Sequence, residues 1–174
     1  MSKPIFMNLW NAFPTHSAYP TMKDLYTKLG GKAEQNIHAP GFGPNGNTCA
    51  SRMSMAFNEG GWPINKTIAA AVGARTISTG DGKHIIFGVE DLKRYLNKTL
   101  GKPTPPDVTL PFDSDIKGKR GIIVFNVNWN RATGHIALYN GHTYREPTYD
   151  DYSRYINQSN PNIRTYQSYF WEFK

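Results

Sequence analysis

The chain contains one cysteine, Cys49, among its 174 residues. A single thiol excludes an intramolecular disulfide framework and any zinc site built from several cysteines. The five histidines are also spread without the short spacings typical of metal ligands, so the sequence predicts no metal site. Cys49 is therefore either a buried apolar side chain or a lone nucleophile.

Long apolar runs are missing as well. No stretch approaches about 18 apolar residues, so we expect no transmembrane helix. The N-terminus has no long apolar core and no small-residue cleavage site, so we expect a protein made in the cytoplasm without a signal peptide. Internal repeats and low-complexity linkers are absent, and 39% of the residues are hydrophobic. This favours a single globular domain over residues 1–174.

Acidic residues are in the minority, with 13 Asp and Glu against 20 Lys and Arg, which gives a net charge of +7. A basic balance favours anionic partners, such as a cell-wall polymer or an acidic protein. The basic residues are scattered, apart from one short cluster at 117–120, and no nucleic-acid motif accompanies them. We therefore expect a solvated basic surface, with neither nucleic acid nor a membrane as a partner.

The expected elements change in kind along the chain. Helices are predicted where apolar residues recur every three or four positions, and strands where β-branched or aromatic residues run together. Helices come first and strands later, which predicts an α+β fold with an antiparallel sheet. The predicted helices are 5–13, 21–29, 48–58 and 89–100, and the predicted strands are 83–89, 121–127, 135–139, 142–146 and a last strand around 169–173.

Cys49 lies at the start of the predicted helix 48–58. The first N–H groups of a helix have no partner within it, and together with the helix dipole they stabilise a thiolate and can hold an oxyanion. The alternative is structural, because Cys49 shares the apolar face of this helix with Met53 and Ala56. A free cysteine is among the most buried residue types. The residues alone leave both interpretations open.

His135 begins a predicted hairpin that turns at Asn140 and Gly141. Asn-Gly is the strongest short hairpin signal, because a type I′ turn needs a positive φ at both central residues. A two-residue loop pairs positions outward along the strands and places His135 directly opposite Glu146, on the same face. Glu146 would then accept a hydrogen bond from the imidazole and orient it toward a thiol.

Four stretches together resemble one known family, the type VI secretion amidase effectors of family 4. Their order and spacing match over most of the chain. The resemblance implies a papain-like fold related to NlpC-type cell-wall peptidases, in which the cysteine-bearing helix packs on an antiparallel sheet. The stretches are 47–54 (NTCASRMS), 61–64 (GWPI), 118–124 (GKRGIIV) and 134–141 (GHIALYNG).

The resemblance also implies the catalytic residues. The family's cysteine corresponds to Cys49 and its histidine to His135. The family pattern has an aspartate eleven residues after the histidine, a position that Glu146 occupies in this chain. We therefore expect Glu146 to be the catalytic acid, with Asp150 or Asp151 as substitutes if the hairpin is distorted.

The function implied by the resemblance is that of an antibacterial toxin. Family members are injected by a type VI secretion apparatus into the periplasm of a rival, where they cut the peptidoglycan stem peptide between D-glutamate and meso-diaminopimelate. A cognate immunity protein protects the producer by plugging the active site. No cofactor is implied. Two alternatives remain: a papain-like amidase or transferase acting on another acyl substrate, and a non-catalytic wall-binding module.

Overall fold

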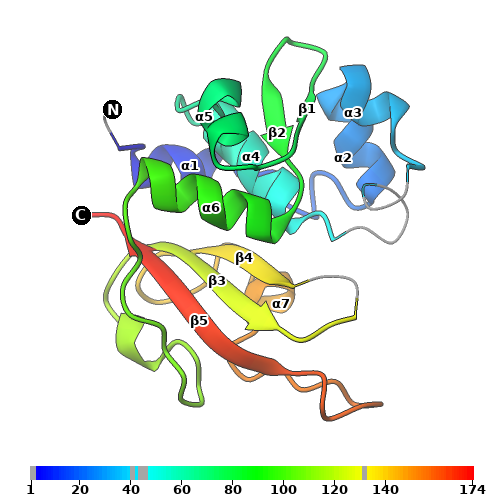
Figure 1. The fold of residues 1–174 in the computed structure, drawn as a ribbon. Coiled ribbons are helices and arrows are strands. Elements are labelled where there is room, and N and C mark those ends of the chain that lie inside the picture. Colours follow the sequence, from blue (N-terminus) through cyan, green and yellow to red (C-terminus); the bar gives the residue numbers. More distant parts are fainter. Residues whose placement is uncertain (1–2, 40–41, 43–46, 131–132) are drawn as a thin grey trace. The chain divides into compact units, whose positions relative to one another are not determined.

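The computed structural model describes residues 3–39, 42, 47–130 and 133–174 (Figure 1). The chain divides into two compact units, Met1–Tyr95 and Leu96–Lys174. We call them the N-terminal and the C-terminal unit. The boundary between them falls inside helix α6 (Val89–Thr99).

The N-terminal unit is mostly helical, and the predicted helices are confirmed with small differences at their ends. Helix α2 begins at a capping box between Thr21 and Asp24 and ends at Gly30, whose φ of 64° suits glycine. The predicted strand 83–89 is shorter, and it pairs with a strand that the sequence pattern did not predict. The elements are α1 (Phe6–Ala12), α2 (Met22–Leu29), α3 (Gly31–Gln35), α4 (Cys49–Glu59), α5 (Lys66–Ala71), β1 (Thr76–Ser78) and β2 (His84–Ile86), and β1 and β2 are antiparallel.

Helix α4 is buried on every side, because all ten residues from Cys49 to Asn58 are buried. It contacts α1 and strand β2. The Ser54 hydroxyl donates to the Ile86 carbonyl at 2.9 Å and accepts from the Ile86 N–H at 3.0 Å. One turn further on, the Asn58 amide donates to the His84 carbonyl at 2.9 Å. Side chains of α4 thus bond to the backbone of β2 as a neighbouring strand would.

The C-terminal unit is built on a three-stranded antiparallel sheet in the order β4-β3-β5 (Figure 1). The central strand β3 (Gly121–Val127) is buried at all seven positions, as its apolar run predicts. Its neighbours are β4 (Gly134–Tyr139) and β5 (Thr165–Glu172), and β5 confirms the predicted C-terminal strand. Beside the sheet lie the short helices η1 (Ser114–Ile116) and α7 (Pro147–Asp150). The predicted α+β class with antiparallel sheets is confirmed.

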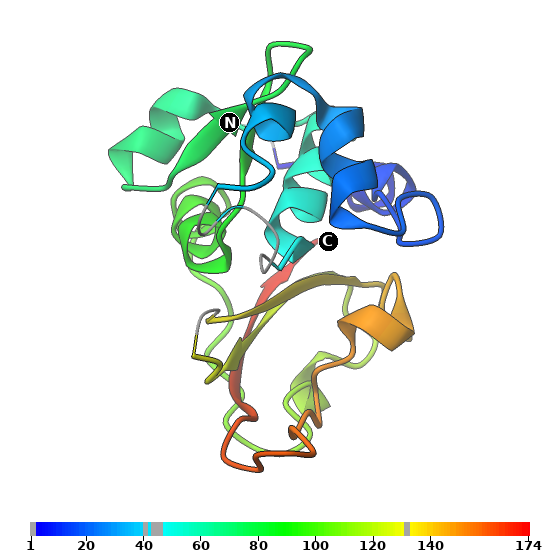
Figure 2. The same ribbon diagram turned by 90° about the vertical axis from the view of Figure 1, so that its right-hand side faces the viewer.

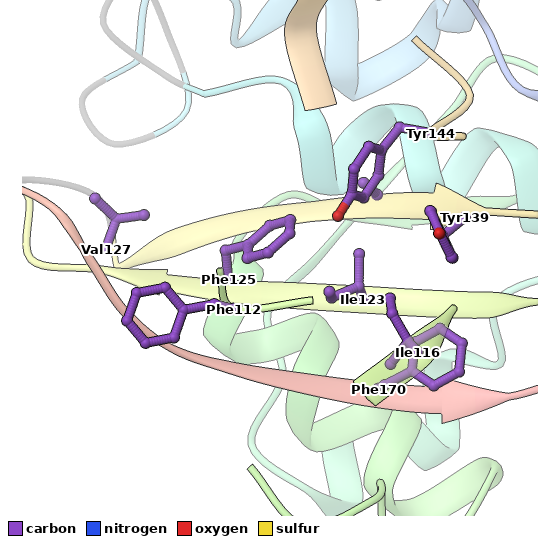
Figure 3. Close-up of a cluster of buried hydrophobic side chains, with 9 residues drawn as sticks. Phe112, Ile116, Ile123, Phe125, Val127, Tyr139, Tyr144 and Phe170 are labelled. Atoms are coloured by element: carbon purple, nitrogen blue, oxygen red, sulfur yellow. The ribbon is translucent and has the colours of Figure 1, made fainter. Parts of the chain in front are cut away.

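One face of this sheet carries the core of the unit. Phe125 on β3 stands directly opposite His135 on β4, so both side chains belong to this face. Residues near η1 and before α7 cover it, and both helices lie on the same side of the sheet (Figure 2). The cluster in Figure 3 comprises Phe112, Ile116, Ile123, Phe125, Val127, Ala137, Tyr139, Tyr144 and Phe170. The histidine is therefore seated at the margin of a packed aromatic core.

The predicted hairpin register is wrong. The loop after β4 has four residues, 140–143, and it is closed by a bridge between Tyr139 and Tyr144. The Asn140 N–H donates to the Thr143 carbonyl, and the Asn140 side chain accepts from the two N–H groups of residues 142 and 143. A side-chain cap of this kind favours the wider loop over the two-residue turn. The predicted strand 142–146 is reduced to this bridge.

No helix among the described residues is both long and apolar enough to cross a membrane.

The bonds between α4 and β2 yield a stability prediction. Replacing Ser54 by alanine removes both hydrogen bonds and leaves the Ile86 N–H and carbonyl buried without this partner. We expect Ser54→Ala to lower the free energy of unfolding by about 2–4 kcal/mol in denaturant titrations. The exposed Ser17 provides the control, and Ser17→Ala should change the free energy of unfolding by less than about 0.5 kcal/mol. Equal stability of the two variants would contradict this role.

Candidate active site

The thiol half of the candidate site belongs to the N-terminal unit. Cys49 is the first residue of α4 and is 5% exposed. Its backbone N–H donates to the Asn47 side-chain oxygen at 3.0 Å. The preceding residue, Thr48, stands at the N-cap position without capping the helix through its side chain. The thiol thus lies where a helix presents N–H groups that have no acceptor inside the helix.

A buried arginine fixes the start of this helix. Arg52 is 1% exposed, and its guanidinium donates to the Thr48 hydroxyl at 3.0 Å. It also donates to the carbonyls of Pro14 and Tyr19, each at 2.8 Å. Because these acceptors come from both the helix start and the segment after α1, one side chain joins the two. The sequence pattern gave no sign of this role, since an arginine inside an amphipathic helix is usually exposed.

A second buried contact supports the first turn of α4. The Tyr26 hydroxyl and the Ser51 hydroxyl lie 3.0 Å apart in the interior. Burial raises the pKa of Tyr26, so the phenol stays neutral at physiological pH. The Tyr26 ring also stacks on Phe42 with the ring centroids 4.5 Å apart. The residues that flank Cys49 are therefore held by hydrogen bonds and by packed rings.

The histidine half belongs to the C-terminal unit. His135 Nε2 lies 2.9 Å from Asp150 Oδ1, and the two side chains are 7% and 3% exposed. A carboxylate in its ionised form can only accept, and toward it Nε2 is the donor; a neutral imidazole in that tautomer has its lone pair on Nδ1. The other carboxylate oxygen, Oδ2, accepts the backbone N–H of Glu146 at 3.0 Å. The carboxylate is thus held at both oxygens.

The wrong hairpin register also removes the predicted placement of Glu146 directly opposite His135, and the carboxylate that bonds His135 Nε2 is that of Asp150. Glu146 is the N-cap residue of α7, and its backbone N–H donates a hydrogen bond to the Asp150 carboxylate. Pro147 starts this helix, where its missing N–H costs nothing, and Asp150 is the last residue of the single turn. Asp150, one of the two alternatives to Glu146 expected from the sequence, is the residue whose carboxylate is hydrogen-bonded to the imidazole. Asp151 is exposed, and its carboxylate accepts from the N–H and hydroxyl of Ser153.

Aromatic residues complete the histidine half, and the sequence pattern missed them. The ring of Tyr152 stacks on the imidazole of His135 with centroids 4.6 Å apart and an interplanar angle of 27°. Trp129 and Tyr155 pack against Tyr152 in turn. None of the three lies in a regular strand or helix, so no periodicity marks them. The other histidine of this hairpin, His142, is exposed in the loop 140–143.

Within residues 3–39, 42, 47–130 and 133–174, no group of three or more His, Cys, Asp or Glu side chains is gathered closely enough to hold a metal ion.

The solved structures that this chain resembles include type VI effectors. The chain is similar to Tae4 from Enterobacter cloacae, solved alone, with 30% identity, a TM-score of 0.74 and coverage of 99% of this chain and 98% of the other. It is similar to Tae4 in Tae4–Tai4 effector–immunity complexes from Enterobacter cloacae (29% identity, TM-score 0.77) and Salmonella Typhimurium (28%, 0.76). Each comparison covers 99% of this chain and 100% of the other. No curated protein sequence matches the chain.

The fold and the comparisons thus define a type VI secretion effector of the amidase class. The family model described as "Type VI secretion system (T6SS), amidase effector protein 4" matches residues 45–171. The chain belongs to this family, Tae4. The family resemblance and the papain-like α+β fold predicted from the sequence are confirmed.

The anchoring by Arg52 yields a second stability prediction. A lysine carries the charge but cannot donate to three acceptors in these directions. We expect Arg52→Lys to lower the free energy of unfolding by about 2–4 kcal/mol, because buried carbonyls lose their donors. The matched control is Arg154→Lys at an exposed position, which should stay within about 0.5 kcal/mol. Chemical denaturation measures both, and a stable Arg52→Lys protein would show that the anchor is dispensable.

Proposed function

We propose that this chain is a cysteine amidase with Cys49 as the nucleophile, His135 as the general base and acid, and Asp150 as the acid that orients the imidazole. The observation that carries the proposal is the buried hydrogen bond between His135 Nε2 and Asp150 Oδ1. A carboxylate in this place fixes the tautomer of a catalytic histidine and stabilises the imidazolium. Membership in an amidase family and a cysteine at the first residue of α4 support the same assignment.

The first half of the reaction forms a covalent intermediate. His135 Nδ1 takes the proton of the Cys49 thiol, and the thiolate attacks the carbonyl carbon of an amide. The carbonyl oxygen becomes an oxyanion, which N–H groups in the first turn of α4 can stabilise. Asp150 balances the charge that now resides on the imidazolium.

The second half releases both products. His135 gives its proton to the amide nitrogen, the carbon–nitrogen bond breaks, and the amine leaves while the acyl group stays on Cys49 as a thioester. A water molecule then attacks the thioester, with His135 accepting its proton. Collapse of this intermediate releases the carboxylic acid and restores the thiol. The scheme uses side chains and backbone N–H groups of the chain together with water.

The substrate we infer is the peptidoglycan stem peptide, cut between D-glutamate and meso-diaminopimelate. This follows from the resemblance of the cysteine, central-strand and histidine stretches to the family-4 amidase effectors. The net charge of +7 also suits approach to an anionic wall. Mass spectrometry of the fragments released from purified peptidoglycan tests the bond directly, since each alternative bond leaves fragments of different mass.

The partners we infer follow from the solved relatives. Several of them are complexes of Tae4 with the immunity protein Tai4. We infer that a cognate immunity protein inhibits this chain in its producer. We also infer that a type VI apparatus delivers the chain into the periplasm of a target cell, where its substrate lies.

The nucleophile assignment predicts the outcome of one substitution. Cys49→Ala should abolish the release of peptidoglycan fragments, because no thiolate remains to form the thioester. Iodoacetamide should inactivate the native protein with the addition of one group, since Cys49 is the only thiol. Circular dichroism should show that Cys49→Ala stays folded. Fragment release by the folded variant would exclude the cysteine mechanism. Wall binding without any fragment release by the native protein would instead support the wall-binding alternative.

The acid assignment separates Asp150 from its neighbours. In Asp150→Asn the new NH₂ group must face either the Nε2–H of His135 or the N–H of Glu146, and both are donors. We expect kcat/KM to fall about 100-fold or more, because the imidazole loses its orientation and its counter-charge.

Two neighbouring acids serve as controls for this substitution. Glu146→Gln keeps the backbone N–H that binds Asp150, and Asp151→Asn changes an exposed carboxylate. Each should retain kcat/KM within about threefold in the same peptidoglycan assay. A large loss in Glu146→Gln with little loss in Asp150→Asn would reverse the assignment.

A further inference from the structure

The imidazole of His135 is covered on one face by an aromatic ring. The Tyr152 ring lies nearly parallel to it, with centroids 4.6 Å apart and an interplanar angle of 27°. This distance is shorter than the roughly 6 Å within which a cation is attracted to a ring face. Tyr152 follows Asp150 by two residues, and its N–H donates to the Asp150 carbonyl at 3.1 Å. The acid and the covering ring therefore come from one short segment.

The covering ring is itself held in place. The Tyr152 carbonyl accepts from the hydroxyl of Thr165, a buried residue on β5, at 2.7 Å. The rings of Trp129 and Tyr155 pack against it with centroids 5.4 Å and 4.9 Å away. Trp129 and Tyr155 are further joined by a hydrogen bond of 3.3 Å from the indole N–H to the phenol oxygen. Because its backbone and its ring are both held by neighbours, the Tyr152 ring keeps one position against the imidazole.

Two consequences follow for His135. A stacked ring restricts rotation of the imidazole about its bond to Cβ, so Nε2 stays aimed at Asp150 and Nδ1 keeps one direction. The ring face also attracts the imidazolium more than the neutral imidazole. Among the described residues, the titratable groups in contact with His135 include the Asp150 carboxylate from α7 and the Tyr152 phenol from the segment after it. Tyr152 thus adds to the charge stabilisation that Asp150 provides.

We propose that Tyr152 is a positioning residue of the amidase, whose ring aims the His135 imidazole and stabilises its protonated form. The inference rests on the proposed role of His135. It assigns the effect to the aromatic face rather than to the phenol hydroxyl. A phenylalanine at position 152 should therefore preserve the effect on His135. A leucine, which fills space without a π-system, should lose it.

The decisive test measures the imidazole itself. In the Cys49→Ala background, NMR of ring-labelled histidines follows the titration of His135, identified by its absence in a His135→Asn sample. We expect Tyr152→Leu to move the midpoint about half to one pH unit lower, the size of a cation–π contribution of about 0.7–1.4 kcal/mol. Tyr152→Phe should leave the midpoint within about 0.2 units, since the ring is kept. An unchanged or raised midpoint in Tyr152→Leu would overturn the proposal.

Activity in the Cys49-containing protein supplies the second readout. We expect Tyr152→Leu to lower kcat about tenfold while KM changes less than about twofold, and Tyr152→Phe to restore the native kcat. Tyr166→Leu, at an exposed tyrosine of β5, controls for a tyrosine-to-leucine change and should behave as native. Equal losses in Tyr152→Leu and Tyr152→Phe would assign the effect to the hydroxyl and contradict the proposal. If the native protein cut no peptidoglycan at all, the proposed function would fail, and the NMR titration would still decide the role of the ring.

Discussion

The buried hydrogen bond between His135 and Asp150 is the contact on which the C-terminal unit is organised. Both side chains are almost wholly buried, and burial is tolerated because Nε2 of the imidazole and both carboxylate oxygens have hydrogen-bond partners. The bond needs β4 in register with β3. This close pairing requires Gly134, because a side chain there would place its Cβ 2.2 Å from the Phe125 carbonyl oxygen. It also needs α7, whose single turn brings the carboxylate back to the strand.

The N-terminal unit also contains buried polar side chains that need hydrogen-bond partners. Helix α4 is surrounded by protein, yet it carries polar side chains along its length. Ser54 and Asn58 bond to the backbone of β2, and Arg52 bonds to the segment after α1. Buried polar groups of this kind fix one arrangement of the helix, because any rotation would leave several of them unpaired. The start of the helix, and with it Cys49, is therefore held rigidly within its unit.

The sequence predicted those parts of the fold that depend on periodicity and strong local signals. The capped helix α2, the buried strand β3 and the cysteine at the start of α4 all follow from such signals. The predicted hairpin register was wrong because the Asn140 side chain caps a wider loop, a preference that the Asn-Gly pair alone does not reveal. The hairpin pattern also did not indicate which carboxylate bonds His135, because the place of Asp150 depends on α7. Arg52 and Tyr152 act through tertiary contacts, which leave no periodic mark.

Helix α7 decides which carboxylate reaches the imidazole. Asp150 bonds to His135 because a one-turn helix starting at Pro147 returns the chain to the sheet. A residue count from the histidine lands on Glu146 in this chain, whereas a count from the proline lands on the last residue of the turn. Spacing from the histidine therefore points to a carboxylate that lies before the turn, whereas the proline-led turn marks the carboxylate that bonds the imidazole.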